Sequence, residues 1–169
     1  MIKIGQKIPD FELEIFDQNG MKKARISDFK GRWIILIFYP KDLSNCIPEL
    51  ENVMRRYKSL HSKVKIVVVS IKSGADFKRL CGKNAQLMKS VAFLPDLTGR
   101  LCTFFETYIE SERSFMHSSF LVDPHGIVKA IDMHDGLSGR PFLSLMDELG
   151  TVGLDSPIDC QKDVAPAYS

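Results

Sequence analysis

The pattern of hydrophobic and polar residues predicts an alternation of strands and helices. Two runs are almost wholly apolar, Trp33–Tyr39 (WIILIFY) and Lys65–Ile71 (KIVVVSI), and each has the length of a buried strand. Between them, apolar residues of the range 46–60 fall close to one face of a helix. Strand, helix and strand in this order predict a βαβ unit, with two parallel strands and a right-handed crossover.

Shorter signals complete the predicted order. The turn Asp17-Gln18-Asn19-Gly20 lies between two extended runs within Phe11–Ile26, and predicts an N-terminal β-hairpin. The turn Asp123-Pro124-His125-Gly126 predicts a second hairpin, with strands at 119–122 and 127–131. We further expect helices at 75–83 and 141–149, a strand at 91–94 and a weak helix at 101–108. This order is typical of an α/β fold with a mixed central sheet, as in the thioredoxin class.

Length and composition indicate one folded domain. The chain has 169 residues, of which 44% are hydrophobic and 26% charged, so disorder over the whole length is excluded. We expect residues 1–149 to form the domain and residues 150–169 to form a C-terminal tail. No apolar run approaches the roughly 20 residues of a membrane-spanning helix. The net charge of +2, without a long basic run, argues against a nucleic-acid or membrane surface.

The cysteines are the first candidates for chemistry. The N-terminal segment has no apolar run of signal-peptide length, so the simplest expectation is a cytoplasmic protein whose cysteines are reduced. Reduced cysteines are more often catalytic, metal-binding or inert than joined in structural disulfides. The histidines show no close ligand spacing with each other or with a cysteine pair, so we expect no metal site. The four cysteines are Cys46, Cys81, Cys102 and Cys160.

Cys46 has the most suggestive position. It lies where the loop after the first buried strand enters the predicted helix, and sites in open α/β sheets lie at the carboxyl ends of strands. The unpaired N–H groups of a first helical turn favour a thiolate, which is the nucleophilic form of cysteine. Pro40 would stiffen this loop, and Ser44 is a good helix-capping residue. From the residues alone, a small buried core cysteine remains the alternative.

Several segments share a recognisable pattern in order along the chain: Gly5–Leu13, Ile26–Trp33, Phe38-Tyr39-Pro40, Cys46–Leu50, Pro95–Gly99, Phe120–Gly126 and Gly139-Arg140. Together they resemble the peroxiredoxins of the AhpC/TSA type over nearly the whole length. The resemblance implies a thioredoxin fold and a thiol peroxidase that needs neither a metal nor another cofactor. It places Cys46 at the peroxidatic position, with Pro40, Ser44 and Arg140 at active-site positions.

The resemblance also implies a reaction sequence. The peroxidatic thiolate attacks the O–O bond of hydrogen peroxide or an alkyl hydroperoxide and becomes a sulfenic acid. A second cysteine then condenses with it, and a thioredoxin-like or flavoprotein reductant restores both thiols. The resemblance to this type of peroxiredoxin also implies that the chain forms a homodimer or a higher homo-oligomer.

Two positions depart from the family pattern. The family motif is Pro, three residues, Thr or Ser, two residues and Cys, whereas only one residue separates Ser44 from Cys46. A shift of one residue at a helix start turns a side chain by about 100°. His117 stands where the family usually has an arginine, and a histidine is mostly neutral at pH 7. His117 is therefore either a pH-dependent partner of Cys46 or a packing residue. A peroxiredoxin-like redox sensor or interaction protein with weakened catalysis stays an alternative.

Two cysteines are candidates for the resolving role. Cys160 lies in the tail, near the position used by typical two-Cys peroxiredoxins, which implies a disulfide between subunits. Cys81 lies 35 residues after Cys46, in a segment similar to that of bacterial thiol peroxidases of the Tpx type, which implies a disulfide within one chain. We favour Cys160, and a one-Cys enzyme reduced by an external thiol is the third alternative. Cys102 is expected to pack in the core.

Overall fold

The computed structural model describes residues 2–29, 31–39, 48, 50, 51, 55, 64–81, 89 and 91–133. The predicted helix 141–149 and the tail 150–169 lie outside these residues. Of the predicted helix 46–60, four residues are described, and all four are helical: Pro48, Leu50, Glu51 and Arg55. The strands are β1 (Glu12–Asp17), β2 (Gly20–Arg25), β3 (Trp33–Phe38), β4 (Val64–Ser70), β5 (Val91–Pro95), β6 (Tyr108–Ile109), β7 (Ser114–Phe115), β8 (Ser118–Val122) and β9 (Val128–Met133). The helices are η1 (Ile26–Phe29), α2 (Gly74–Cys81), α4 (Arg100–Phe104) and η3 (Glu110–Glu112).

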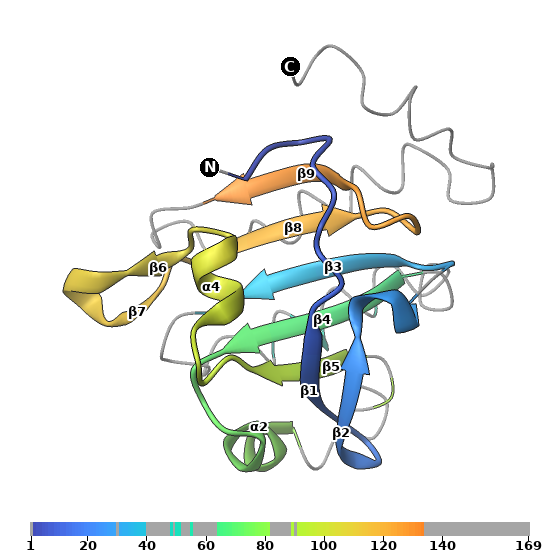
Figure 1. Cartoon of the computed structure of the whole chain (residues 1–169). Coiled ribbons are helices and arrows are strands. Elements are labelled where there is room, and N and C mark those ends of the chain that lie inside the picture. The colour runs from blue at the N-terminus through green and yellow to red at the C-terminus, as the bar shows by residue number, and fades with distance from the viewer. Residues whose placement is uncertain are drawn as a thin grey trace.

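The described residues form a mixed sheet of seven strands in the order β2-β1-β5-β4-β3-β8-β9 (Figure 1). Its centre is parallel, because β4 runs parallel to both β3 and β5. β8 continues the sheet antiparallel to β3, with Leu121 opposite Ile35. The parallel pairing of β3 and β4 confirms the two parallel strands of the predicted βαβ unit.

Both predicted hairpins are confirmed, and an aspartate shapes each turn. The Asp17 carboxylate accepts the backbone N–H of Asn19 at 2.8 Å, between β1 and β2. The Asp123 carboxylate accepts the backbone N–H groups of His125 and Ile127 at 2.8 and 3.0 Å, between β8 and β9. Aspartate favours such turns because its short side chain bonds backbone groups two residues further on.

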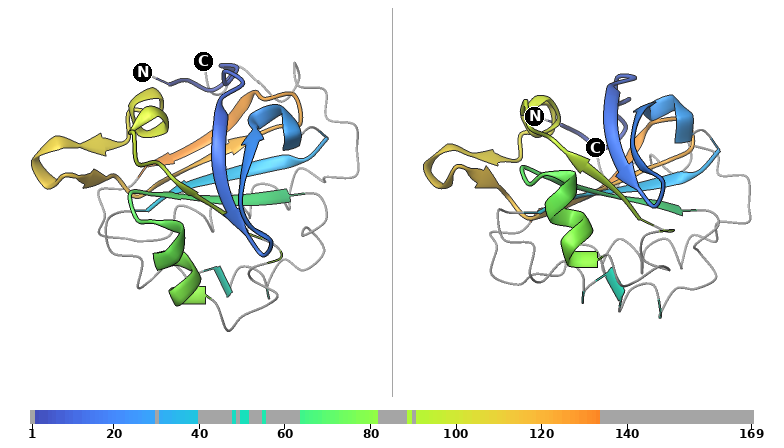
Figure 2. Two further views of the ribbon diagram at one scale, coloured as in Figure 1. Left: turned by 60° about the horizontal axis from the view of Figure 1, so that its bottom comes forward. Right: turned by 90° about the horizontal axis from the view of Figure 1, so that it is seen from below.

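The sheet is covered on both faces, with α2 on one side and α4 on the other (Figure 2). Alternate residues of β3 from Ile34 to Phe38 belong to one core cluster, which also contains Leu101 of α4. On the opposite face, Phe77 of α2 stacks on Phe93 of β5 with ring centroids 4.4 Å apart. Cover on both faces explains why β3 is buried at every position and reads as one continuous apolar run.

The predicted weak helix 101–108 is wrong in its second half. The helix α4 ends at Phe104, and Tyr108 instead begins β6, which pairs with β7 in a hairpin that projects from the body (Figure 1). Glu106 adopts a left-handed backbone with φ 54°, and the N–H of Thr107 donates to the carbonyl of Cys102 at 2.9 Å. These two features end the helix by a turn of the backbone that the residue pattern did not reveal.

Candidate functional site

The carboxyl end of β3 brings together groups from three strands. The N–H of Tyr39, directly after β3, donates to the carbonyl of Val69 in β4 at 3.0 Å. Phe38 lies opposite Ser118, the first residue of β8, so the residue before β8 must lie near Tyr39. That residue is His117, whose ring centroid is 4.6 Å from that of Tyr39, with the planes inclined by 33°. The structure thus places His117 beside the carboxyl end of β3, which is the strand that precedes Cys46 in the sequence.

The pair of Tyr39 and His117 is buried. Tyr39 is 2% exposed and His117 is 8% exposed. The ring of Phe38, the residue before Tyr39, contacts those of Phe105, Phe115 and Phe120 at centroid distances of 5.3 to 6.0 Å. Because successive side chains of a strand point to opposite faces, these phenylalanines belong to the other face of the sheet. An imidazole and a phenol thus lie buried together at the carboxyl end of β3.

Two buried serines begin β8, and they differ in their hydrogen-bond partners. The Ser118 hydroxyl donates to the carbonyl of Met116 at 3.1 Å. The Ser119 hydroxyl has no hydrogen-bond partner in the part of the chain that the structure describes. A buried hydroxyl without a partner carries a desolvation penalty.

The structure places only part of the predicted site. His117 lies beside Tyr39, and Cys81 is the last residue of α2. The roles of the other predicted residues stay predictions, because those residues lie outside the described ones: Pro40, Ser44, Cys46, Arg140 and Cys160.

Cys102 is a packing residue, as the sequence predicted. It belongs to α4, is 4% exposed, and its thiol donates to the carbonyl of Gly99 at 3.2 Å. Burial and, to a smaller extent, the neighbouring Asp96 carboxylate together raise the pKa of the Cys102 thiol to about 11. At neutral pH this thiol is protonated and is a poor nucleophile.

Asp96 also fixes the start of α4. Its carboxylate accepts the backbone N–H groups of Leu101 at 3.3 Å and Cys102 at 2.9 Å. Among the described residues, no group of three or more His, Cys, Asp or Glu side chains could hold a metal ion. No helix of the described ranges is long and apolar enough to cross a membrane.

Comparison with known proteins decides the family. The profile of the AhpC/TSA family matches residues 4–131. The chain belongs to the AhpC/TSA family. It is similar to the crystal structure of Enterococcus faecalis AhpC, with a TM-score of 0.78 and 28% identity, covering 90% of this chain and 93% of that one. The thioredoxin-like α/β fold predicted from the sequence is thereby confirmed.

Two curated proteins are similar to this chain over most of its length. Alkyl hydroperoxide reductase C of Salmonella typhimurium is 29% identical over 153 residues, which cover 88% of this chain and 81% of the relative. The mitochondrial thioredoxin-dependent peroxide reductase of Drosophila melanogaster is 25% identical over 145 residues, which cover 82% of this chain and 62% of that relative. Both relatives are thus peroxide-reducing enzymes by name, and each has a low sequence identity to this chain.

The contacts that sequence reasoning missed join residues distant in the chain. The ring contact between Tyr39 and His117 follows only from the pairing of β3 with β8. Lys129 lies within an apolar strand pattern, yet its amine is buried 3.7 Å from the Asp123 carboxylate. The sequence feature that could have predicted this ion pair is a lysine inside an apolar run that follows a turn aspartate.

Proposed function

We propose that this peroxiredoxin is a thiol-dependent peroxidase that reduces hydrogen peroxide or alkyl hydroperoxides through Cys46. The main support is its membership of the AhpC/TSA family over residues 4–131, a range that includes Cys46, the cysteine that the sequence resemblance assigns to the peroxidatic role. The position of His117 beside Tyr39, at the end of the strand leading to Cys46, agrees with a site there.

The proposed reaction balances without a cofactor. The Cys46 thiolate attacks one peroxide oxygen, so an S–O bond forms, the O–O bond breaks, and the leaving oxygen takes a proton to become water or an alcohol. A resolving thiol then displaces water from the sulfenic acid and forms a disulfide. A reductant dithiol supplies two electrons and restores both thiols. The name of the Drosophila relative supports a thioredoxin-like reductant, and a flavoprotein disulfide reductase is the other candidate.

The other predicted site residues have separate roles in this proposal. Pro40 stiffens the loop that leads to Cys46, and the Ser44 hydroxyl orients the peroxide. Arg140 provides a permanent positive charge near the sulfur. His117 provides an N–H donor whose charge depends on pH, in place of the family arginine.

A homodimer is part of the proposal. Within the described residues, β9 is the last strand of the sheet. Among the residues that the structure describes, the N-terminal segment pairs with the beginning of β9, where the N–H of Gly5 donates to the carbonyl of Val128 at 2.7 Å and the N–H of Val128 donates to that of Gln6 at 2.9 Å. The strand at the edge of a sheet can serve as a template for pairing with a second chain.

A redox sensor is the second candidate function. The observations that favour it are the buried histidine in place of a fixed cation and the single residue between Ser44 and Cys46. A sensor would oxidise once and stop, whereas a peroxidase turns over repeatedly when a reductant is present.

The deciding experiment mixes reduced protein with one equivalent of hydrogen peroxide in a stopped-flow instrument. The single tryptophan, Trp33, is the fluorescence reporter. We expect oxidation far faster than that of a free cysteine, lost in Cys46→Ser and retained in Cys102→Ala. A wild-type rate equal to that of a free cysteine would contradict the peroxidase. Repeated additions of peroxide with excess dithiol then separate turnover from single oxidation.

Non-reducing gels after peroxide treatment identify the resolving cysteine. We expect a disulfide-linked dimer that disappears in Cys160→Ser. A monomer that only migrates faster, and loses that shift in Cys81→Ser, would instead assign the role to Cys81. Absence of any disulfide would indicate a one-Cys enzyme.

A further inference from the structure

A cavity of about 350 Å³ opens at the amino end of β3, opposite the end that carries Tyr39 and His117. Its walls come from the segment before β1, from η1 and the start of β3, and from the turn between β8 and β9. A strand of six residues spans about 20 Å, so the two ends are well separated. The proposed peroxidase chemistry makes no use of this cavity.

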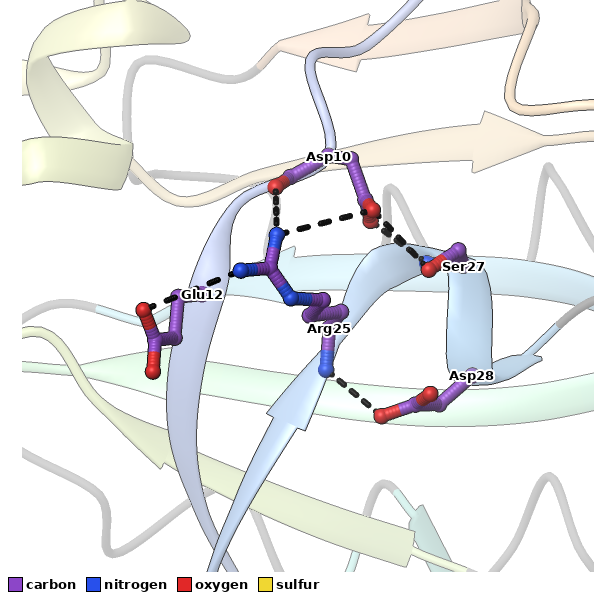
Figure 3. Close-up of polar contacts among 5 residues, drawn as sticks. All are labelled: Asp10, Glu12, Arg25, Ser27 and Asp28. Carbon is purple, nitrogen blue, oxygen red and sulfur yellow. Dashed lines mark hydrogen bonds and ion pairs between the residues drawn. The ribbon is translucent and has the colours of Figure 1, made fainter.

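The two carboxylates in the cavity wall are compensated by cations that do not line it. Asp10 accepts the N–H and the hydroxyl of Ser27 at 2.8 and 2.9 Å, and Arg25 lies 3.8 Å from the same carboxylate (Figure 3). Figure 3 shows the Arg25 side chain extending between Asp10 and Glu12. Asp123 is likewise paired with the buried Lys129 at 3.7 Å. Each acid of the cavity wall therefore has a cation beside it, and Arg25 is shared between Asp10 and Glu12.

The cations that do line the cavity lack such compensation. Lys7 and Arg32 are both exposed, and neither has an ion-pair partner among the residues that the structure describes. His125, from the turn after β8, adds an imidazole that can donate a hydrogen bond. Two fixed positive charges from distant parts of the chain thus converge on one hollow.

The rest of the lining is apolar. Ile8, Ile26 and Ile34 are buried, and Phe29 is half-buried beside them. A volume of about 350 Å³ lies at the lower end of the range of roughly 300 to 1,000 Å³ for small-molecule sites. Such sites combine an apolar surface with a few polar groups that fix orientation. The ligand should therefore be small, anionic at one end and apolar at the other.

We propose that this cavity binds a small organic phosphate monoester. A phosphate monoester carries between about −1.5 and −2 charges at neutral pH, which matches Lys7 and Arg32 together. The guanidinium of Arg32 can hold two phosphate oxygens at once, and Lys7 acts as a point charge. The organic group lies against Ile8 and Phe29. Inorganic phosphate shares the head group but lacks the apolar part.

The test is calorimetric titration of the reduced full-length protein with phenyl phosphate, and separately with inorganic phosphate. We expect saturable binding of phenyl phosphate at one site per chain, and binding of inorganic phosphate at least about tenfold weaker. Lys7→Gln and Arg32→Gln should each weaken phenyl phosphate binding by about tenfold, because each removes a charge-assisted contact. Lys23→Gln removes the same charge from the exposed face of β2 and should leave the affinity unchanged.

Circular dichroism spectra establish that the three variants are folded before they are compared. No saturable heat with phenyl phosphate overturns the proposal. So does an equal loss in all three variants, because this would indicate a general effect of net charge. If inorganic phosphate bound as tightly as phenyl phosphate, the proposed contribution of the organic group to binding would be overturned. The titration contains no peroxide, so its failure is distinguishable from failure of the peroxidase.

Discussion

The two ends of the β3–β8 strand pair carry different kinds of polar group. At the amino end of β3, the buried polar groups are charged and paired, with Asp123 beside Lys129 at 3.7 Å. At the carboxyl end, the buried polar groups are Tyr39, His117 and the serines that begin β8. The amino end of the strand pair thus carries a buried ion pair, and the carboxyl end carries a buried imidazole beside a phenol.

The difference separates two uses of buried polar groups. A buried ion pair is costly to break, because removal of one partner leaves the other charge uncompensated in a poor solvent. A histidine side chain can instead change its charge near neutral pH, which suits acid–base chemistry. Substitutions at the amino end should therefore act on stability, and those at the carboxyl end on reactivity.

The largest effect is expected for Asp123→Ala. The change leaves Lys129 buried without this partner and removes the acceptor of two turn N–H groups, so the free energy of unfolding should fall by about 3–5 kcal/mol. Urea denaturation followed by circular dichroism measures it. The double variant Asp123→Ala/Lys129→Met should recover part of the loss. A loss below about 1 kcal/mol would show that the pair is not a structural junction.

The next effect concerns reactivity and not stability. If His117 faces the Cys46 sulfur, His117→Arg adds a permanent cation where a histidine is mostly neutral, and should raise the rate of Cys46 alkylation at pH 7 by roughly tenfold. Iodoacetamide labelling across pH measures it, in a background where the other cysteines are replaced. His125→Arg makes the same change at the other end of the sheet and should leave the profile unaltered. An identical profile in both variants would remove His117 from the site.

A smaller contrast lies between the neighbouring serines. Ser118→Ala removes a hydrogen bond to the carbonyl of Met116 and should cost about 1 kcal/mol of unfolding free energy. Ser119→Ala removes a hydroxyl that has no partner among the described residues, so its effect should lie within about 0.5 kcal/mol of zero or be stabilising. Parallel urea curves compare them. Equal losses would indicate that both hydroxyls are bonded in solution.

The smallest effect belongs to the ion pair between Lys22 and Asp17, 2.9 Å apart at the tip of the first hairpin. Burial alone would raise the pKa of Asp17, but hydrogen bonds from Lys22 and the Asn19 N–H, with the charges of Lys22 and Lys65, hold that pKa below its usual value. Lys22 is half exposed, so Lys22→Gln should cost only about 0.5 kcal/mol at pH 7.

The pH dependence of this pair has a definite sign. A lowered native pKa contributes stability above the unfolded-state value of about 3.9, and this stability is lost as pH falls through the native value. The difference between wild type and Lys22→Gln should therefore shrink as pH is lowered below about 4. Thermal unfolding at several pH values between 3 and 7 measures it. A difference that grows toward low pH would contradict the assignment.

Local patterns explain why much of the fold could be predicted. The continuous apolar runs identify β3 and β4, because strands covered on both faces need apolar residues at every position. The turns at Asp17 and Asp123 identify both hairpins, because their side chains bond nearby backbone groups. The end of α4 escaped prediction, because its position depends on a left-handed Glu106 and on the pairing of β6 with β7.

The sequence by itself determined the family and the positions of the two hairpins. It also identified Cys46 and His117 as candidate site residues. These features depend on residue type, spacing and turns, which are local. Only the tertiary structure decided which distant groups meet: His117 with Tyr39, the buried Asp123 with Lys129, and the cations of the amino-end cavity. Their separation along the chain carries no information about their distance, because strand pairing sets that distance.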